Sequence, residues 1–227
     1  MSSKLIIALD FSTAEQALQF VKPLSPEQCK LKVGFELYVA AGPNFVRRLV
    51  DQGFDVFLDL KFHDIPNTVA SACRAAAKLG VWMMNVHASG GEAMLLAAQD
   101  AVNIATNTPK LIAVTVLTSM DKNQLNSIGL NIDPAIQVQR LAQLSQNCGL
   151  DGVVCSAQEA KELRQQLGQN FLLVTPGIRP IGTDKGDQSR VMTPEKAVLA
   201  GVSYMVVGRP ITQTDNPQKV IEQIYNC

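Results

Sequence analysis

Short apolar runs rich in β-branched residues alternate with segments of helical period along the whole chain of 227 residues. The runs predict strands at residues 5–9, 31–33, 56–60, 82–86, 111–116, 152–155, 172–174 and 204–207. The intervening segments predict helices at residues 13–21, 44–52, 66–79, 92–104, 134–147, 157–167, 194–200 and 217–225. A strand–helix alternation of this kind favours a parallel sheet, and eight strands are the number that closes a (β/α)8 barrel.

The alternation predicts one α/β domain over residues 1–227, a (β/α)8 TIM barrel, because no linker, low-complexity segment or further repeat interrupts it. An open doubly wound sheet is the alternative. That fold often carries a Gly-x-Gly-x-x-Gly turn after its first strand, and this chain has none there. The absence of that turn favours the barrel.

Composition narrows the class of protein and its partners. The chain is 47% apolar and 18% charged with a formal net charge of zero, which is ordinary for a soluble enzyme. It has no basic stripe, so we expect no nucleic-acid partner, and its apolar runs are too short to span a bilayer. No secretory signal pattern opens the chain, and its five scattered cysteines include no Cys-x-x-Cys. These features predict reduced thiols and a cytoplasmic location.

Catalytic groups of such barrels lie where strands end, and the third strand ends in the most informative stretch, DLKFHDIPNT at residues 59–68. Asp59 and Lys61 share one face of the strand because side chains alternate. Buried charges need partners, so a structural ion pair is one interpretation. A second acid at Asp64 and a helix start at Pro66 favour an active-site edge instead.

The pattern Asp-x-Lys-x-x-Asp followed by Ile-Pro-Asn-Thr resembles the signature of the orotidine 5′-phosphate decarboxylase family. A related sugar-phosphate decarboxylase carries a similar acid–lysine–acid pattern, but the ten-residue stretch is more specific. A second match is the run Thr-Pro-Gly-Ile-Arg-Pro at residues 175–180, followed by Gly-Asp-Gln and Arg-Val-Met-Thr-Pro. The resemblance implies a TIM barrel that converts orotidine 5′-phosphate to UMP and carbon dioxide without a metal or cofactor.

The resemblance also implies catalytic roles. Lys61 would protonate C6 of the pyrimidine and stabilise the developing carbanion, while Asp59 would lie near the substrate carboxylate and align Lys61. Lys32 would complete the charged array together with Asp64 of a second subunit. The family is a homodimer in which Asp64 and Thr68 reach the neighbouring site.

Other strand ends carry candidate binding residues. Asp10 ends the first strand, where it suits helix capping, and the resemblance implies contact with the ribose hydroxyls. Lys32 lies between apolar residues and could extend its ammonium to solvent; the family places a lysine there against ribose and Asp59. Thr118 and Ser119 follow the fifth strand and match residues that meet the pyrimidine base. Asn123 and Asn126 predict an irregular segment after them.

The last two strand ends predict the rest of the substrate site. A long polar loop follows the seventh strand, and long loops in compact domains are often functional. The resemblance assigns substrate contacts there to Pro176, Arg179 and Gln188. Gly208 and Arg209 end the eighth strand, where barrels frequently hold phosphate, and a guanidinium is a forked donor for that group.

Two other functions fit parts of the pattern. A metal-dependent decarboxylase or epimerase acting on a sugar phosphate would share the fold and the phosphate site. A noncatalytic nucleotide-binding barrel would bind UMP without turnover. The two histidines, His63 and His87, are too few for a histidine-rich metal site, and we expect none.

Overall fold

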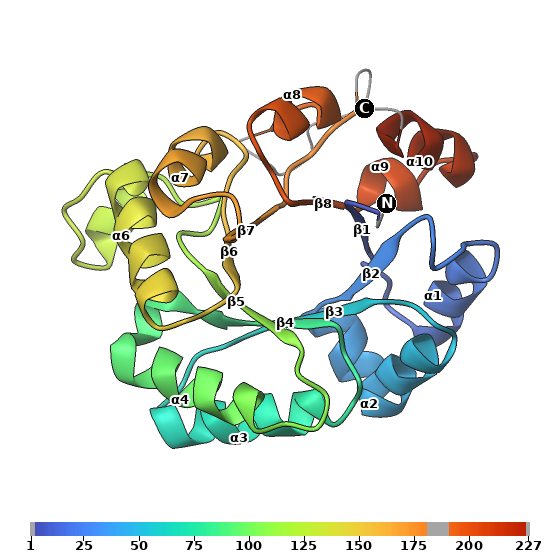
Figure 1. Cartoon of the computed structure of the whole chain (residues 1–227). Coiled ribbons are helices and arrows are strands. Elements are labelled where there is room, and N and C mark those ends of the chain that lie inside the picture. The colour runs from blue at the N-terminus through green and yellow to red at the C-terminus, as the bar shows by residue number, and fades with distance from the viewer. Residues whose placement is uncertain (1–2, 181–190, 226–227) are drawn as a thin grey trace.

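The structure is a computed structural model that describes residues 3–180 and 191–225. At its centre eight parallel strands form a closed ring, which Figure 1 shows end-on. The strands are β1 (Leu5–Ala8), β2 (Lys30–Val33), β3 (Val56–Phe62), β4 (Met83–His87), β5 (Lys110–Val114), β6 (Gly152–Val154), β7 (Leu172–Thr175) and β8 (Tyr204–Val207).

The pairing of the first and last strands closes the ring. Leu5 lies opposite Met205 and Ile7 opposite Val207, and every other strand pairs in parallel with its neighbours in sequence. An open doubly wound sheet would leave two unpaired edges. The closed pairing confirms the predicted (β/α)8 barrel and rules out the open sheet.

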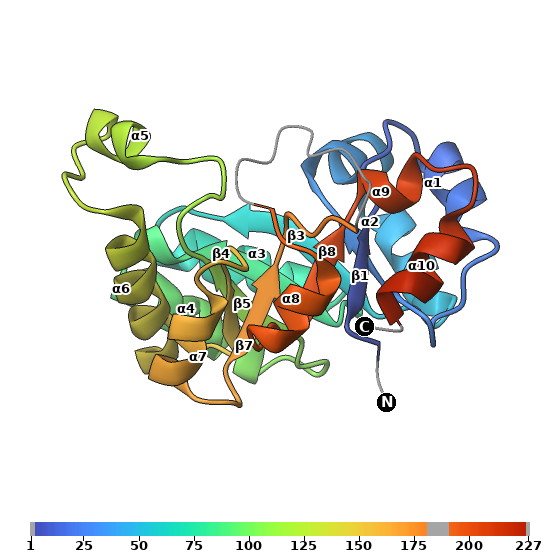
Figure 2. The ribbon, with the colours of Figure 1, turned by 90° about the horizontal axis from the view of Figure 1, so that it is seen from above.

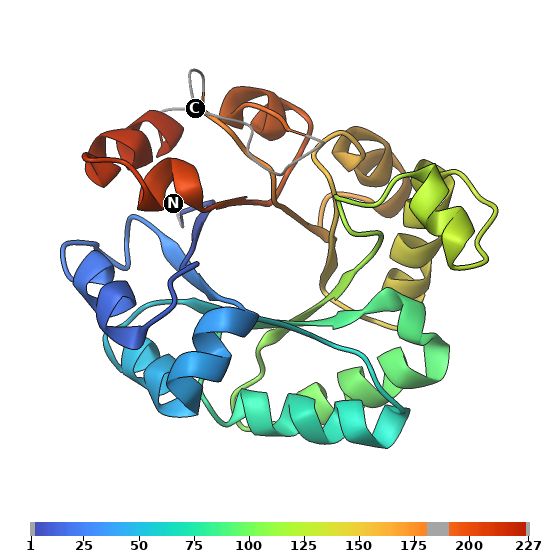
Figure 3. The same cartoon turned by 180° about the vertical axis from the view of Figure 1, so that it is seen from behind.

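Helices cover the outside of the ring (Figures 1 and 3). They are α1 (Ala14–Val21), α2 (Phe35–Asp51), α3 (Pro66–Ala77), α4 (Glu92–Asn103), α5 (Lys122–Ser127), α6 (Pro134–Asn147), α7 (Ala160–Leu167), α8 (Pro194–Leu199), α9 (Arg209–Thr212) and α10 (Pro217–Tyr225), with a short 3-10 turn at Ala88–Gly90. None of the helices in residues 3–180 and 191–225 is long and apolar enough to cross a membrane.

Two helical segments differ from the sequence prediction. The predicted helix 44–52 is the second half of α2, which begins at Phe35 and breaks at Gly42, where φ is 70°. The segment predicted to be irregular contains α5, because Asp121 and Gln124 form a reciprocal capping box at its start. Figure 2 shows α5 standing away from the barrel wall.

Strand alternation sorts the apolar side chains into two clusters. A large cluster lies between the strands and the helices and includes Leu31, Leu58 and Val86. A smaller one fills the barrel itself: Ile6, Ala8, Phe57, Met83, Ile112, Val174 and Val206. The barrel is therefore a packed core and not a pore, and polar groups can gather only at its ends.

Strand β2 places a buried lysine at each end of the barrel. Lys30 and Lys32 are two residues apart and so share the inner face. At the amino-terminal end Lys30 forms an ion pair with Asp55, and its Nζ lies 4.6 Å from the centre of the Trp82 ring. Burial, together with the Asp55 charge, raises the pKa of Tyr204, whose ring lies 6.0 Å from the same Nζ. This end is closed by a paired cation packed against aromatic rings.

Asp55→Asn should destabilise the fold, because it leaves the Lys30 ammonium against the Trp82 ring without a counter-charge. Asp55 is half-exposed, so we expect a fall in the free energy of unfolding of about 1–2 kcal/mol, less than for a fully buried pair. Urea unfolding followed by fluorescence of Trp82, the one tryptophan of the chain, measures this change.

The matched control removes both charges. Lys30→Met combined with Asp55→Asn keeps an apolar side chain against the rings and should recover most of the lost stability. If the double variant is less stable than Asp55→Asn alone, Asp55 does not stabilise the fold by compensating the charge of Lys30.

Candidate active site

A pocket of about 400 Å³ opens at the carboxyl-terminal end of the barrel, within the usual size range of small-molecule sites. Its walls come from the ends of seven strands and differ in character around the ring. Charged side chains stand just after β1 and in the last residues of β2 and β3. The side chains near β5, β6 and β7 are mostly apolar, and arginines follow β7 and β8. The pocket can therefore orient a ligand with chemically distinct parts.

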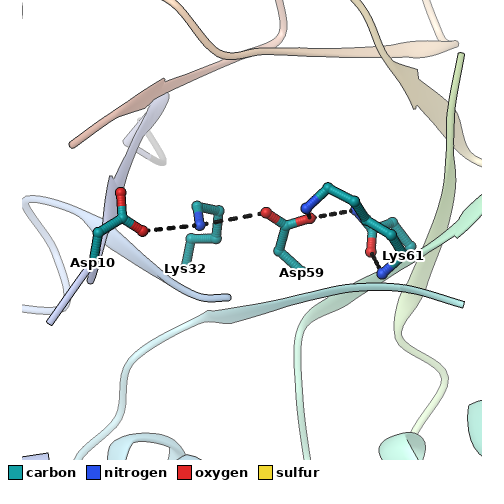
Figure 4. A network of polar contacts seen from close by, with 5 residues as sticks. Asp10, Lys32, Asp59 and Lys61 are labelled. Carbon is teal, nitrogen blue, oxygen red and sulfur yellow. Dashed lines mark hydrogen bonds and ion pairs between the residues drawn. The ribbon is translucent and has the colours of Figure 1, made fainter. Parts of the chain in front are cut away.

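The charged wall is a row of alternating charges (Figure 4). Lys32 Nζ lies 3.4 Å from Asp10 Oδ1 and 3.3 Å from Asp59 Oδ2. Lys61 Nζ donates to Asp59 Oδ1 at 2.7 Å. Each ammonium therefore faces at least one carboxylate, and Asp59 is shared between two cations.

Asp59 remains ionised although its side chain is only 13% exposed. Burial acts to raise its pKa, but the charges of Lys32 and Lys61 and hydrogen bonds from Lys61 and Asn85 outweigh that effect. The pKa of Asp59 therefore lies below its ordinary value. A fixed anion is held beside Lys61 at neutral pH.

Asn85 is a site residue that the sequence analysis did not single out. Its side chain is fully buried and donates from Nδ2 to Asp59 Oδ1 at 2.7 Å. The sequence did contain a hint of this role, because Asn85 is a polar residue in a strand that is otherwise apolar nearby. Met83, Met84 and Val86 of β4 are all buried. Phe35 was also missed; its ring centre lies 4.9 Å from Lys61 Nζ.

The opposite wall offers apolar surface with few polar groups. It is formed by Val114, Val116, Leu117, Thr118, Val154, Val174 and Pro176. Thr118 and Pro176 were predicted from the sequence to contact substrate. A flat, uncharged ring fits against such a wall. The hydroxyl of Thr118 can form a hydrogen bond with a polar group of that ring.

Arginines form the third part of the pocket. Arg179 and Arg209 both line it, together with the predicted Gly208. A Cβ at Gly208 would lie 3.2 Å from Asp10 Oδ2, so glycine allows β8 to approach the aspartate at the end of β1. The Arg179 backbone N–H donates to the Met192 carbonyl at 2.9 Å, which fixes the base of the segment that follows β7.

Most of the predicted site residues meet in this pocket: Asp10, Lys32, Asp59, Lys61, Thr118, Pro176, Arg179, Gly208 and Arg209. Asp64, Thr68 and Ser119 are exposed and are not among its lining residues. Asp64 Oδ1 instead accepts from the Ile65 N–H at 2.6 Å. Gln188 lies outside the described residues. The structure locates the other predicted residues in one pocket, and the roles of all of them stay predictions.

The two histidines lie together beside the charged row. The ring centres of His63 and His87 are 5.4 Å apart. Burial lowers the pKa of His87, and the nearby His63 and Lys61 lower it further against the opposing effect of Asp59. Within residues 3–180 and 191–225, no group of three or more His, Cys, Asp or Glu side chains is arranged to hold a metal ion.

Comparison with known proteins agrees with the motifs. The model of the orotidine 5′-phosphate decarboxylase / HUMPS family matches residues 3–224. The chain belongs to this family. A relative from Pseudoalteromonas translucida named orotidine 5′-phosphate decarboxylase is 58% identical over 224 residues, which cover 98% of this chain and 96% of the relative. The predicted family is therefore confirmed.

Solved structures place the chain in the same group. The crystal structure of orotidine 5′-phosphate decarboxylase from Lactobacillus acidophilus superimposes with a TM-score of 0.87 at 40% identity, covering 98% of this chain and 99% of that one. The enzyme of the same name from Pyrococcus horikoshii, at 24% identity and a TM-score of 0.78, shares the fold. The barrel of this chain is thus the fold of a solved member of the family.

The low pKa of Asp59 predicts how stability depends on pH. Its carboxylate is protonated at lower pH in the folded than in the unfolded chain, so between those two pKa values the unfolded state binds more protons. Its contribution is therefore present above about pH 3.8, its ordinary pKa, and is lost as pH falls below that value. Below about pH 3.8, wild type should therefore lose stability on acidification more steeply than Asp59→Asn, as measured by urea unfolding from about pH 5 down to about pH 2.5. Equal slopes would contradict the low pKa.

Proposed function

We infer that the chain decarboxylates orotidine 5′-phosphate to UMP and carbon dioxide. The observation that carries this conclusion is the Lys61–Asp59–Lys32 row at the mouth of a pocket with one apolar wall and arginines at its side. The 58% identical relatives named for this reaction support it.

The reaction needs placed charge more than a reactive nucleophile. Loss of carbon dioxide leaves an electron pair at C6 of the pyrimidine, which the ring does not stabilise well. Lys61 would set its ammonium beside C6, stabilise the developing carbanion and then donate the proton that completes UMP. Fixed charges in a site shielded from water are effective because they need no reorganisation as charge develops.

Asp59 would act on both the substrate and Lys61. It would hold the ammonium in line through the 2.7 Å contact and lie near the substrate carboxylate. Repulsion between the two carboxylates would be relieved as carbon dioxide departs, a ground-state contribution to catalysis. Lys32 would keep Asp59 ionised.

The remaining substrate contacts follow the chemistry of the pocket walls. Asp10 and Lys32 would bind the ribose hydroxyls, while Thr118, Ser119 and Pro176 would meet the base. Arg179, Gln188, Gly208 and Arg209 would bind the phosphate end. Binding energy from the phosphate, far from the reacting bond, would be available to lower the barrier of the decarboxylation.

We further propose a cytoplasmic homodimer whose sites are shared between subunits. Asp64 is exposed beyond the end of β3, and the adjacent Ile65 is 68% exposed, so a polar and an apolar group are both available to a partner. Asp64 and Thr68 of one subunit would reach the charged row of the other. This arrangement would give that row a further acid.

Lys61→Ala should remove nearly all turnover while UMP still binds, because the ammonium acts in the transition state and the other contacts remain. The decrease in absorbance on adding orotidine 5′-phosphate measures turnover, and calorimetry measures UMP binding. Lys122→Ala on the exposed helix α5 is the matched control and should keep wild-type activity.

Chelation separates this function from a metal-dependent reaction on a sugar phosphate. Wild-type turnover should be unchanged after EDTA treatment. Activity that disappears with EDTA and returns with a divalent metal would contradict the proposed reaction. UMP binding by wild type without any turnover would indicate a noncatalytic nucleotide-binding barrel.

Subunit mixing tests the shared site. Lys61→Ala and Asp64→Ala homodimers should each be nearly inactive. In a mixed dimer one site carries both substitutions and the other neither, because exchange across a two-fold axis is reciprocal. Equal amounts that pair at random should therefore recover roughly a quarter of wild-type activity.

A tag on one variant verifies that subunits have exchanged. If mixed dimers form and activity stays at the level of the parents, Asp64 does not act across the interface. Activity in the Asp64→Ala homodimer close to wild type would equally exclude an essential role.

A further inference from the structure

Asn85 is a polar side chain in a place that favours apolar ones. It is fully inaccessible to solvent and shares the inner face of β4 with Met83, a member of the cluster that fills the barrel. Burying an amide costs free energy unless its polar atoms form hydrogen bonds. The contacts that Asn85 makes therefore indicate why an amide is tolerated there.

Both ends of the Asn85 amide bind residues of β3. Oδ1 accepts from the backbone N–H of Lys61 at 2.7 Å, and Nδ2 donates to Asp59 Oδ1 at 2.7 Å. An N–H must face an acceptor and a carboxylate must face a donor, so this orientation of the amide is the one that satisfies both partners. A single side chain is fitted to two residues of the charged row.

The backbone of β3 explains why Lys61 needs such a partner. Leu58 pairs with Met84 and Phe62 with Val86, so β3 has two more residues than β4 between these pairs. Lys61 lies in this bulge with φ at 46°, and it is the one non-glycine residue with positive φ among the described residues. Such a conformation is strained for a residue other than glycine and persists where surrounding contacts hold it.

Asn85 thus reaches Lys61 by two routes. It holds the backbone nitrogen directly, and it holds the carboxylate oxygen that also accepts from Lys61 Nζ at 2.7 Å. The other oxygen of Asp59 is left to Lys32 at 3.3 Å. The amide therefore fixes which oxygen each lysine faces and the direction in which Lys61 leaves the strand.

We propose that Asn85 is a positioning residue for the decarboxylation, acting through Asp59 and Lys61 without touching the substrate. The proposal rests on the function proposed above. A misplacement of about 1 Å can cost about 100-fold in rate, so a loss of the amide should lower kcat strongly. Substrate affinity, to which Asp10 and the other walls of the pocket contribute, should change little.

Asn85→Leu removes both hydrogen bonds and keeps the side chain close in size. We expect kcat to fall about 100-fold, while KM and the Kd for UMP stay within about threefold. Thr115→Val is the matched control, because Thr115 is buried at the end of β5 and its hydroxyl donates to the Val154 carbonyl at 2.9 Å, away from the charged row. It should keep kcat within about threefold of wild type.

The pH dependence of Asn85→Asp activity distinguishes a positioning role from a purely structural one. An ionised Asp at this position would repel Asp59, whereas its protonated form can accept from the Lys61 N–H and donate to Asp59 as the amide does. The activity of this variant, divided by that of wild type at each pH, should therefore rise as pH falls from 8 to 5.5. If Asn85→Leu does not fold, the pH dependence of this activity ratio still tests whether Asn85 positions Asp59 and Lys61.

Three results would overturn the proposal: kcat of folded Asn85→Leu within threefold of wild type, UMP binding lost in parallel with kcat, or a flat activity ratio for Asn85→Asp. Absence of turnover in the wild type itself would instead reject the proposed function. In that event crystal structures decide the role of Asn85. Displacement of Lys61 from its left-handed conformation in Asn85→Leu supports positioning, and an unchanged Lys61–Asp59 contact excludes it.

Discussion

The interaction of Asp59 with two lysines is the constraint on which the site depends. Three charged groups at the end of a packed barrel are tolerable only because the anion lies between the cations, at 2.7 Å from Lys61 Nζ and 3.3 Å from Lys32 Nζ. Neighbouring backbone is fitted to this arrangement. A Cβ at Gly34 would lie 3.1 Å from Lys32 Nζ, so glycine at the end of β2 leaves room for the ammonium.

The two ends of β2 show how the barrel separates stability from chemistry. Lys30 and Lys32 share one face of one strand, but Lys30 is paired and packed against Trp82 at the amino-terminal end, whereas Lys32 lines the open pocket at the other. The apolar cluster between them keeps the two cations in separate environments. Substitutions at the closed end should therefore change folding more than turnover, in keeping with the division of roles in such barrels.

The barrel could be predicted from the sequence because each strand is apolar where it faces the helices, and eight such runs leave few alternatives. Asp59 and Lys61 were predictable because charges in a buried strand are conspicuous. The contacts of Asn85 with Asp59 and Lys61 could not be predicted. They depend on the irregular pairing of β3 with β4 and on a positive φ at Lys61, which no residue type signals. The first half of α2 was hidden by the break at Gly42. The roles proposed for the exposed Asp64 and Thr68 would require a second subunit.

Side chains of the barrel itself form and hold the charged row, and this bears on what binding energy would do under the proposed function. Lys61 contacts Asp59, and Asn85 contacts both, so these side chains hold the strained backbone at Lys61. Under the proposed function, contacts to a distant phosphate would not have to build the array. They would instead oppose the repulsion between the substrate carboxylate and Asp59, which the departure of carbon dioxide would relieve. Preorganised charge and remote binding energy would thus act on different parts of the same barrier.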